Sequence, residues 1–234
     1  MRIRTGAVTD VGRIREGNED AFLVTDRFVA VADGMGGHLG GEVASNLALE
    51  VFAALTDRGE GDLTSRIVEA NRAVVERSRR DREVSGMGTT FTVIAFEGGL
   101  GRLAHVGDSR AYRYRDGELV ALTEDHTLVR RMVRAGEITE EEARAHPQRS
   151  VVTRALGAEP DVEVDEGQLD LRTGDRYLLC SDGLTGMVVE DDIRAVLAEV
   201  ADPEAAARRL VDAANANGGH DNITVVIADV DDAS

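Results

Sequence analysis

The chain has 234 residues, of which 42% are hydrophobic and 30% are charged. This composition is typical of a globular protein and argues against extensive disorder, and the length makes one domain the first expectation. The net charge is −17, and all 27 basic residues are arginine. Because nucleic acids and anionic membranes require clustered positive charge, we expect neither as a partner.

The chain contains one cysteine and no sign of a targeting segment. Cys180 lies inside an apolar run and is expected to be a small buried core residue. No stretch approaches the ~18 apolar residues of a membrane span, and the N-terminus lacks the apolar core of a signal peptide. We therefore expect a cytoplasmic protein, and we separately expect a monomer. The alternative, one domain of a longer protein that carries a membrane anchor, stays open.

Apolar runs and helical periodicity predict strands in adjacent groups with helices between them. Because strands and helices do not alternate strictly, an α+β sandwich with antiparallel sheets is favoured over a parallel sheet. Glycine-rich turns predict hairpins at 97–101 and 114–118, and Asp202 is expected to cap the last helix. The predicted strands are 2–8, 21–25, 28–33, 89–97, 101–107, 110–115, 118–122, 162–169, 176–181 and 223–230, and the predicted helices are 42–56, 63–79, 128–135, 191–200 and 203–215.

The segment 126–157 differs from the rest of the chain in charge. It carries six arginines against four glutamates, so it is locally positive within an acidic protein. A helix, an acidic helical turn and a break at His146-Pro147 predict an inserted flap. The alternative is that these arginines only solvate an exposed helical face.

Aspartates stand at the ends of several predicted strands, beside glycines that allow close backbone approach. One such pair on its own would indicate a turn, but the pattern recurs at four strand ends. Carboxylates brought together repel by several kcal/mol per pair at an effective dielectric of about 20, so we expect hard divalent cations among them. The four positions are Asp33 before Gly34, Asp108 after Gly107, Asp182 before Gly183, and Asp221, which leads into the last strand.

The candidate ligands are oxygen atoms, because the five histidines are scattered and no cysteine cluster exists. This set disfavours zinc and favours Mg²⁺ or Mn²⁺. Two such ions can bridge a water, lower its pKa and stabilise an in-line displacement at phosphorus. Arg15 can bind two phosphate oxygens, and Glu19 and Asp20 can hold metal-bound waters. The pattern therefore indicates hydrolysis of a phosphate ester.

Six motifs, in one order along the chain, resemble those of the metal-dependent protein phosphatases of type 2C, specifically bacterial serine/threonine phosphatases. They extend over residues 15–222, nearly the whole chain. The resemblance implies a four-layer αββα sandwich with two central antiparallel sheets flanked by helix pairs. It also implies a single catalytic domain over residues 1–234, with a variable flap at about 126–157. The motifs are Arg15-x-x-Asn18-Glu19-Asp20, Asp33-Gly34-Met35-Gly36-Gly37-His38, Gly88-Thr89-Thr90, Gly107-Asp108-Ser109-Arg110, Ser181-Asp182-Gly183-Leu184 and Asp221-Asn222.

The same resemblance implies roles for the metal ligands. Asp33 is similar to the carboxylate that bridges two ions, and Gly34 to the residue that gives its carbonyl to one of them. Asp182 and Asp221 resemble the ligands of the other ion. Asp108 resembles the ligand of a third, weaker site. We therefore expect two Mn²⁺ or Mg²⁺ ions, and a third is an open alternative.

Catalytic roles implied by the resemblance fall on Arg15, which would bind the phosphate, and Asp20, which would hold a metal water. Eukaryotic relatives place a histidine directly after the Asp-Gly pair as a general acid, whereas this chain has Met35 there. His38 is then the nearest candidate acid, and a metal-bound water or a loop-ordering role for His38 is the alternative. His126, which follows Glu124-Asp125, is a weaker rival for that proton transfer and is expected instead to have a structural role.

Two further features have a structural interpretation. His105 lies inside an apolar strand and is expected to be a packed core histidine. The Gly88-Thr89-Thr90 motif is expected to begin a β-branched strand rather than to take part in catalysis.

The resemblance implies a phosphatase that attacks phosphoserine and phosphothreonine directly with a metal-bridged hydroxide and opposes bacterial Ser/Thr kinases. Its expected partners are phosphorylated proteins, including such kinases and their substrates. Two alternatives stay open: a phosphatase for anti-sigma antagonist proteins, and a non-catalytic binding module. The motif from Arg15 to Asp20 disfavours the first, and the full set of acidic ligands disfavours the second.

Overall fold

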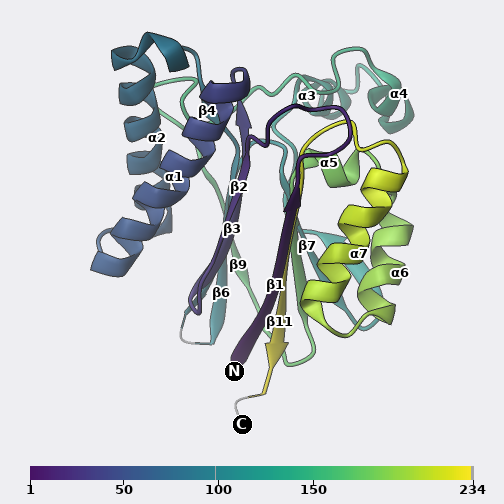
Figure 1. The fold of residues 1–234 in the computed structure, drawn as a ribbon. Coiled ribbons are helices and arrows are strands. Elements are labelled where there is room, and N and C mark those ends of the chain that lie inside the picture. Colours follow the sequence, from purple (N-terminus) through teal and green to yellow (C-terminus); the bar gives the residue numbers. More distant parts are fainter. Residues whose placement is uncertain (98, 233–234) are drawn as a thin grey trace.

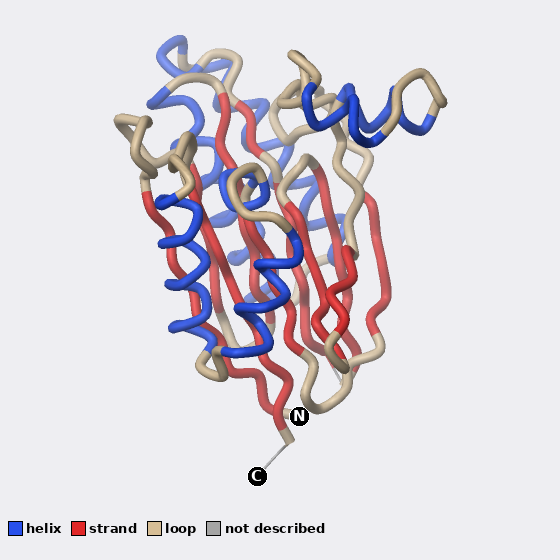
Figure 2. The backbone as a smooth tube through the Cα atoms, turned by 90° about the vertical axis from the view of Figure 1, so that its right-hand side faces the viewer, coloured by secondary structure: helices blue, strands red, loops and turns tan. Residues whose placement is uncertain are grey.

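The computed structural model describes residues 1–97 and 99–232, and for His38 the backbone only. Two antiparallel β-sheets stack face to face, and helices cover the outer face of each (Figure 1). Both termini lie at one end of the sandwich, and longer loops gather at the opposite end (Figure 2). The expected α+β arrangement of two sheets between helical layers is confirmed.

One sheet consists of five antiparallel strands. They are β1 (Arg2–Asp10), β7 (Arg110–Arg115), β8 (Glu118–Ala121), β10 (Arg176–Cys180) and β11 (Ile223–Asp231). Their order across the sheet is β1-β11-β10-β7-β8, so the first and last strands of the chain are neighbours. Between β7 and β8, Asp116 and Gly117 adopt positive φ angles of 52° and 85°. These angles are those of the predicted Asp-Gly hairpin turn.

The second sheet faces the first. Its strands are β2 (Asp20–Val24), β3 (Phe28–Met35), β4 (Gly88–Thr89), β5 (Phe91–Glu97), β6 (Leu100–Val106) and β9 (Asp165–Leu169). The order is β2-β3-β5-β6-β9, with the short β4 paired to the end of β3. The β5 and β6 strands pair as the predicted hairpin at 97–101 requires, although Gly98 in its turn lies outside the described residues.

Helices form the two outer layers and part of the loop-bearing end. They are α1 (His38–Arg58), α2 (Leu63–Arg80), the 3₁₀ turn η1 (Arg82–Val84), α3 (Leu128–Arg134), α4 (Glu140–Ala145), α5 (Asp182–Thr185), α6 (Glu190–Glu199) and α7 (Pro203–Ala216). The pair α1 and α2 packs on the second sheet, and α6 and α7 pack on the first (Figure 1). As predicted, Asp202 caps α7 by accepting a hydrogen bond from the Ala205 N–H at 2.8 Å.

Alternation along the strands divides the apolar core into three layers. On β3, Val29 and Val31 are buried between the two sheets, whereas Ala30 and Ala32 are buried on the opposite side, against the helical layer that contains Phe52. The central strands are therefore apolar on both faces, which leaves their ends as the places where charged side chains can stand.

The structure corrects several predicted boundaries. The strand expected at 89–97 is interrupted at Thr90, and the helix expected from Glu42 begins four residues earlier, at His38. The short elements α5 and η1 were not predicted. Glycines in the first turn of α1 are poor helix formers, so local pattern alone places that start too late.

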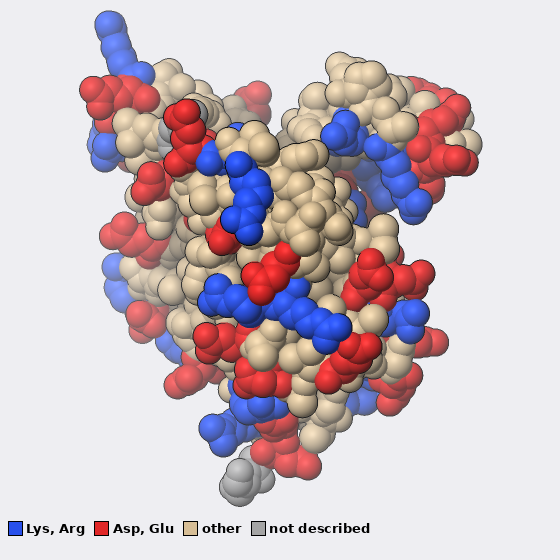
Figure 3. All heavy atoms as spheres, turned by 45° about the vertical axis from the view of Figure 1, so that its right-hand side comes forward, with Lys and Arg blue, Asp and Glu red and all other residues tan. Residues whose placement is uncertain are grey.

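None of the helices in the described part of the chain has the length and apolar character that spanning a bilayer requires. On the face drawn in Figure 3, basic and acidic side chains are interspersed, and no continuous basic surface is seen there.

Candidate active site

The segments that carry the predicted ligands all reach the same edge of the sandwich. Strands β3, β6 and β10 end there, and β11 begins there (Figure 1). Burial raises the pKa of Asp33 well above its ordinary value, and the charges of Asp20, Asp182, Asp108 and Asp221 raise it further. The structure therefore brings these five carboxylates within electrostatic range of one another.

The backbone of Asp33 is held by two threonines. Its N–H donates to Thr90 Oγ1 at 2.9 Å, and its carbonyl accepts from Thr89 Oγ1 at 3.0 Å. The next residue, Gly34, donates its N–H to the Glu19 carbonyl at 3.2 Å. Thr89, at the end of β4, and Thr90, between β4 and β5, thus position a predicted ligand, whereas the sequence predicted only that they begin a strand.

Asp20 lies opposite Asp33 in the β2–β3 pair and is 7% exposed. Ser181 Oγ donates to its Oδ2 at 2.7 Å, whereas its buried Oδ1 has no hydrogen-bond partner among the described residues. Burial, together with the charges of Asp182 and Asp221, raises the pKa of Asp20 to about 7. A buried carboxylate oxygen without a partner, among like charges, matches the needs of a cation or of its bound water.

Asp108 and Asp182 have raised pKa values for similar reasons. Burial, followed by the charges of Asp182 and Asp125, raises the pKa of Asp108 to about 8. Burial and the charge of Asp221 raise the pKa of Asp182 to about 6, although the nearby Arg15 opposes this shift. These groups cannot all be ionised at neutral pH without positive charge among them, so cation binding is expected to release protons.

Arg15 makes an ion pair at this edge. Its guanidinium donates to Asp221 Oδ2 at 2.6 Å, and the two side chains are 48% and 36% exposed. The hydrogen bond to Asp221 raises the pKa of Arg15. The predicted phosphate-binding group therefore lies directly beside a predicted metal ligand.

Asn222 is a site residue whose contacts the sequence did not reveal. Its Oδ1 accepts from the Glu19 N–H at 2.8 Å, and its Nδ2 donates to the carbonyls of Val11 at 3.0 Å and Gly17 at 2.9 Å. One buried amide thereby fixes the loop that carries Arg15 to the start of β11. The Asp-Asn pair at 221–222 was the only sequence signal for this role.

A cleft of about 490 Å³ adjoins the carboxylates. Its wall comes from the sheet edge, from the flap, residues 126–157, and from α5 with the residues that follow it. Arg110, also in the wall, is held by two hydrogen bonds of 2.7 Å to the Asp125 carboxylate. Charged residues of the wall include Asp108, Asp182 and Asp221 at the edge and Arg130, Arg144 and Arg149 from the flap.

The donor set fits hard divalent ions that keep part of their water. Among the described residues, no three acidic, histidine or cysteine side chains lie close enough together to enclose an ion by themselves. Mg²⁺ is usually bound through one or two carboxylates with several waters. Dispersed carboxylates, one of them with an unpaired oxygen, agree with that mode of binding.

The histidines lie in different settings. His38 is the first residue of α1, and its side chain is outside what the structure describes, so its role as an acid stays a prediction. His105 is 1% exposed and bonded to Thr92 Oγ1 at 2.9 Å. Burial lowers its pKa to about 4. His105 is thus a core histidine, as expected.

Comparison with known proteins gives consistent results. A family model described as protein phosphatase 2C matches residues 14–217. The serine/threonine protein phosphatase PstP of Mycobacterium tuberculosis is 44% identical over 235 residues, which cover 98% of this chain and 45% of that protein. The serine/threonine phosphatase stp of Listeria monocytogenes is 41% identical over 237 residues, covering 95% of this chain and 94% of that protein.

A solved structure gives the same result for the fold. The crystal structure of the PstP catalytic domain in complex with two manganese ions aligns with a TM-score of 0.90 at 41% identity, over 99% of both chains. The chain spans about half the length of the Mycobacterium tuberculosis protein and nearly all of the Listeria protein. Fold, sequence and motif order agree, and the chain belongs to the protein phosphatase 2C family.

Proposed function

We propose that the chain hydrolyses phosphoserine and phosphothreonine esters in proteins and uses Mn²⁺ or Mg²⁺ to do so. The observation that carries this proposal is the meeting of Asp20, Asp33, Asp182 and Asp221 at one sheet edge beside Arg15. The PstP catalytic domain, solved with two manganese ions, supports two ions here. When bound, such a pair supplies Lewis acidity and an activated water for displacement at phosphorus.

The residues have distinct proposed roles in holding the ions. Asp33 would serve both ions, the Gly34 carbonyl one of them, and Asp182 and Asp221 the other. Asp108, with its raised pKa, would serve a third and weaker site. These assignments agree with the repulsion among the carboxylates, which bound cations would relieve.

Arg15 is the proposed phosphate-binding residue, because it is exposed and stands next to Asp221. A guanidinium can donate two parallel hydrogen bonds to phosphate oxygens. Asp20 and Glu19 are proposed to hold water at the ions, and the unpaired Oδ1 of Asp20 supports that role. His38 is the proposed acid for the leaving serine or threonine oxygen.

Direct hydrolysis, without a covalent phosphoenzyme, is supported by the state of the single cysteine. Cys180 is fully buried in β10, and burial raises the pKa of its thiol to about 12. A buried, protonated thiol is a poor nucleophile.

The proposed substrates are phosphorylated proteins, including Ser/Thr kinases and the proteins that they phosphorylate. We also propose that the chain acts as a single domain, as a monomer and in the cytoplasm. The cleft supports a protein substrate, since it extends from the carboxylates along the arginine-bearing flap.

Phosphate release from a phosphothreonine peptide tests the proposal. The wild type should turn over with Mn²⁺ and stop when EDTA is added, and Asp182→Asn should lose almost all turnover. Near-normal turnover by Asp182→Asn would contradict this ligand assignment, and a binding module would show no metal-dependent turnover at all. Parallel assays with phosphorylated anti-sigma antagonist proteins would identify that alternative through a preference for them over kinase substrates.

A further inference from the structure

His126 lies at the start of the flap and contacts the turn that carries Asp108. The Gly107 N–H donates to His126 Nδ1 at 2.9 Å, and the His126 N–H donates to the Gly107 carbonyl at 2.7 Å. Both polar groups of Gly107 are thus bonded to one residue. We call these two hydrogen bonds the His126–Gly107 clamp. Asp108 follows Gly107 directly, so the clamp acts one residue away from a proposed metal ligand.

The Gly107 backbone has little freedom to find other partners. Its φ angle is +114°, a conformation that L side chains rarely adopt, and a Cβ there would collide with Thr90. Thr90 in turn is hydrogen-bonded through Oγ1 to Ser109 Oγ at 2.8 Å. The turn is therefore packed on one side by Thr90 and fixed on the other by His126.

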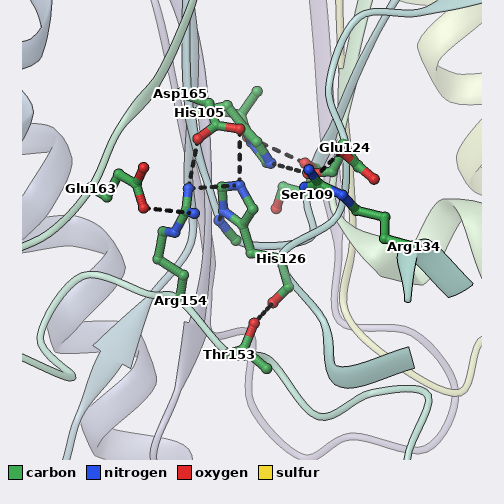
Figure 4. A network of polar contacts seen from close by, with 11 residues as sticks. His105, Ser109, Glu124, His126, Arg134, Thr153, Arg154, Glu163 and Asp165 are labelled. Atoms are coloured by element: carbon green, nitrogen blue, oxygen red, sulfur yellow. Dashed lines mark hydrogen bonds and ion pairs between the residues drawn. The ribbon is translucent and has the colours of Figure 1, made fainter. Parts of the chain in front are cut away.

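The far side of the His126 ring meets residues at the end of the flap. Figure 4 shows the ring between Asp165 and Arg154, with Thr153 bonded to the His126 carbonyl. Nε2 lies 3.2 Å from Asp165 Oδ2 and 3.0 Å from Arg154 Nη1, and Arg154 also donates to Asp165 Oδ1 at 2.6 Å. The two ends of the flap therefore meet at His126.

These contacts select one protonation form of the ring. With the proton on Nε2, Nδ1 accepts from Gly107 and Nε2 donates to Asp165, so two hydrogen bonds form. With the proton on Nδ1, only the contact with Arg154 can form, and the buried Gly107 N–H loses its acceptor. Burial lowers the pKa of His126, which agrees with a neutral ring.

We propose that His126 is a positioning residue: in its Nε2–H form it fixes the Gly107–Asp108 turn and fastens that turn to both ends of the flap. The importance of the turn rests on the proposed function, in which Asp108 is a ligand of the weak metal site. Residues that orient metal ligands typically change metal affinity by about 10- to 100-fold when they are replaced.

The first test needs no variant. Nitrogen-15 NMR of the His126 ring in metal-free wild-type protein should show a protonated Nε2 and an Nδ1 that accepts a hydrogen bond from the Gly107 amide. A protonated Nδ1 would overturn the proposal, because Gly107 could not then donate to it.

Paired substitutions supply the second test. In His126→Asn, the amide oxygen can take the position of Nδ1, whereas the longer side chain of His126→Gln places its amide nearer the position of Nε2. The Gly107 amide in metal-free protein should exchange at least about tenfold faster in the Gln variant and near the wild-type rate in the Asn variant. The control is Glu163→Gln, because Glu163 is 79% exposed and contacts Arg154 rather than His126.

Calorimetric titration with Mn²⁺ links the turn to the metal site. The weakest binding step should lose about tenfold in affinity in His126→Gln, and much less in His126→Asn or Glu163→Gln. Unchanged exchange of Gly107 in His126→Gln would overturn the clamp, and unchanged weak-site affinity despite faster exchange would overturn its link to Asp108. A wild type that binds no Mn²⁺ would contradict the proposed function, whereas the metal-free NMR measurements would still decide whether His126 fixes the turn.

Discussion

Replacing Asp20 by asparagine is expected to stabilise the metal-free protein at pH 8. Burial and the neighbouring carboxylates raise the pKa of Asp20 from 3.8 to about 7. Because the folded pKa lies above the unfolded one, folding disfavours the ionised form. The folded state therefore gains stability from holding the Asp20 proton. This gain is fully present below about pH 4 and is lost as the pH rises through 7. The asparagine side chain does not ionise and escapes the loss.

The size of the effect follows from the two pKa values of Asp20. Between pH 5 and pH 7 the unfolded chain carries the carboxylate while the folded protein holds the proton, so the free energy of unfolding falls by about 3 kcal/mol. The advantage of Asp20→Asn over the wild type should therefore be about 3 kcal/mol larger at pH 8 than at pH 5. Comparing the two pH values cancels the constant cost of burying an amide.

Urea unfolding in EDTA at both pH values measures this difference. Asp62→Asn is a suitable control, because Asp62 caps α2 on the surface and its pKa is lowered by hydrogen bonds to Ser65. That variant should lose stability by the same amount at the two pH values, because both lie above the pKa of Asp62 in the folded and in the unfolded chain. An advantage of Asp20→Asn over the wild type that is equal at the two pH values, or that is smaller at pH 8, would refute the electrostatic reasoning. Saturating Mn²⁺ should reverse the order, since the wild type binds it more tightly.

Three further outcomes are expected. Arg15→Ala should lower kcat/KM for a phosphopeptide about 10- to 100-fold, because a charged hydrogen bond to phosphate is lost. An unchanged kcat/KM would exclude that contact. Burial lowers the pKa of His105 to about 4, so the free energy of unfolding of the wild type should fall by about 3 kcal/mol as the pH falls from 6.5 to 4. Urea unfolding of a His105→Gln variant should lack this decrease, and a variant with the same pH dependence as the wild type would contradict the reasoning. In Gly183→Ala the new Cβ would collide with the Asn222 carbonyl, so urea unfolding should show a lower stability and calorimetric titration a lower affinity for Mn²⁺. Gly167→Ala is the control and should change neither, because the atom nearest to its new Cβ is 3.7 Å away.

The sequence predicted the parts of the fold that depend on local pattern. Apolar runs placed the central strands, and the Asp116-Gly117 pair placed a hairpin turn with the expected positive φ angles. The start of α1 was placed four residues too late because its first turn is rich in glycine. Tertiary contact explains those glycines: a Cβ at Gly41 would collide with the Glu19 carboxylate, and one at Gly34 with the Gly41 carbonyl.

The candidate site was predictable where residue type and strand end coincide, as at Asp33 and Asp182. Its supporting contacts were not, because they join residues far apart in the chain. Thr90 reaches the Asp33 backbone across 57 positions, and Asn222 reaches the Glu19 backbone across 203. Only the folded structure brings such partners together.

Metal content and turnover, measured on the same samples, test the central claim that the carboxylates hold the ions that drive hydrolysis. EDTA-treated wild type should release no phosphate from a phosphothreonine peptide, and stepwise addition of Mn²⁺ should restore turnover as the second ion binds. Asp33→Asn should bind less Mn²⁺ and remain inactive at Mn²⁺ concentrations that saturate the wild type. Full turnover by metal-free wild type, or by Asp33→Asn, would contradict the account.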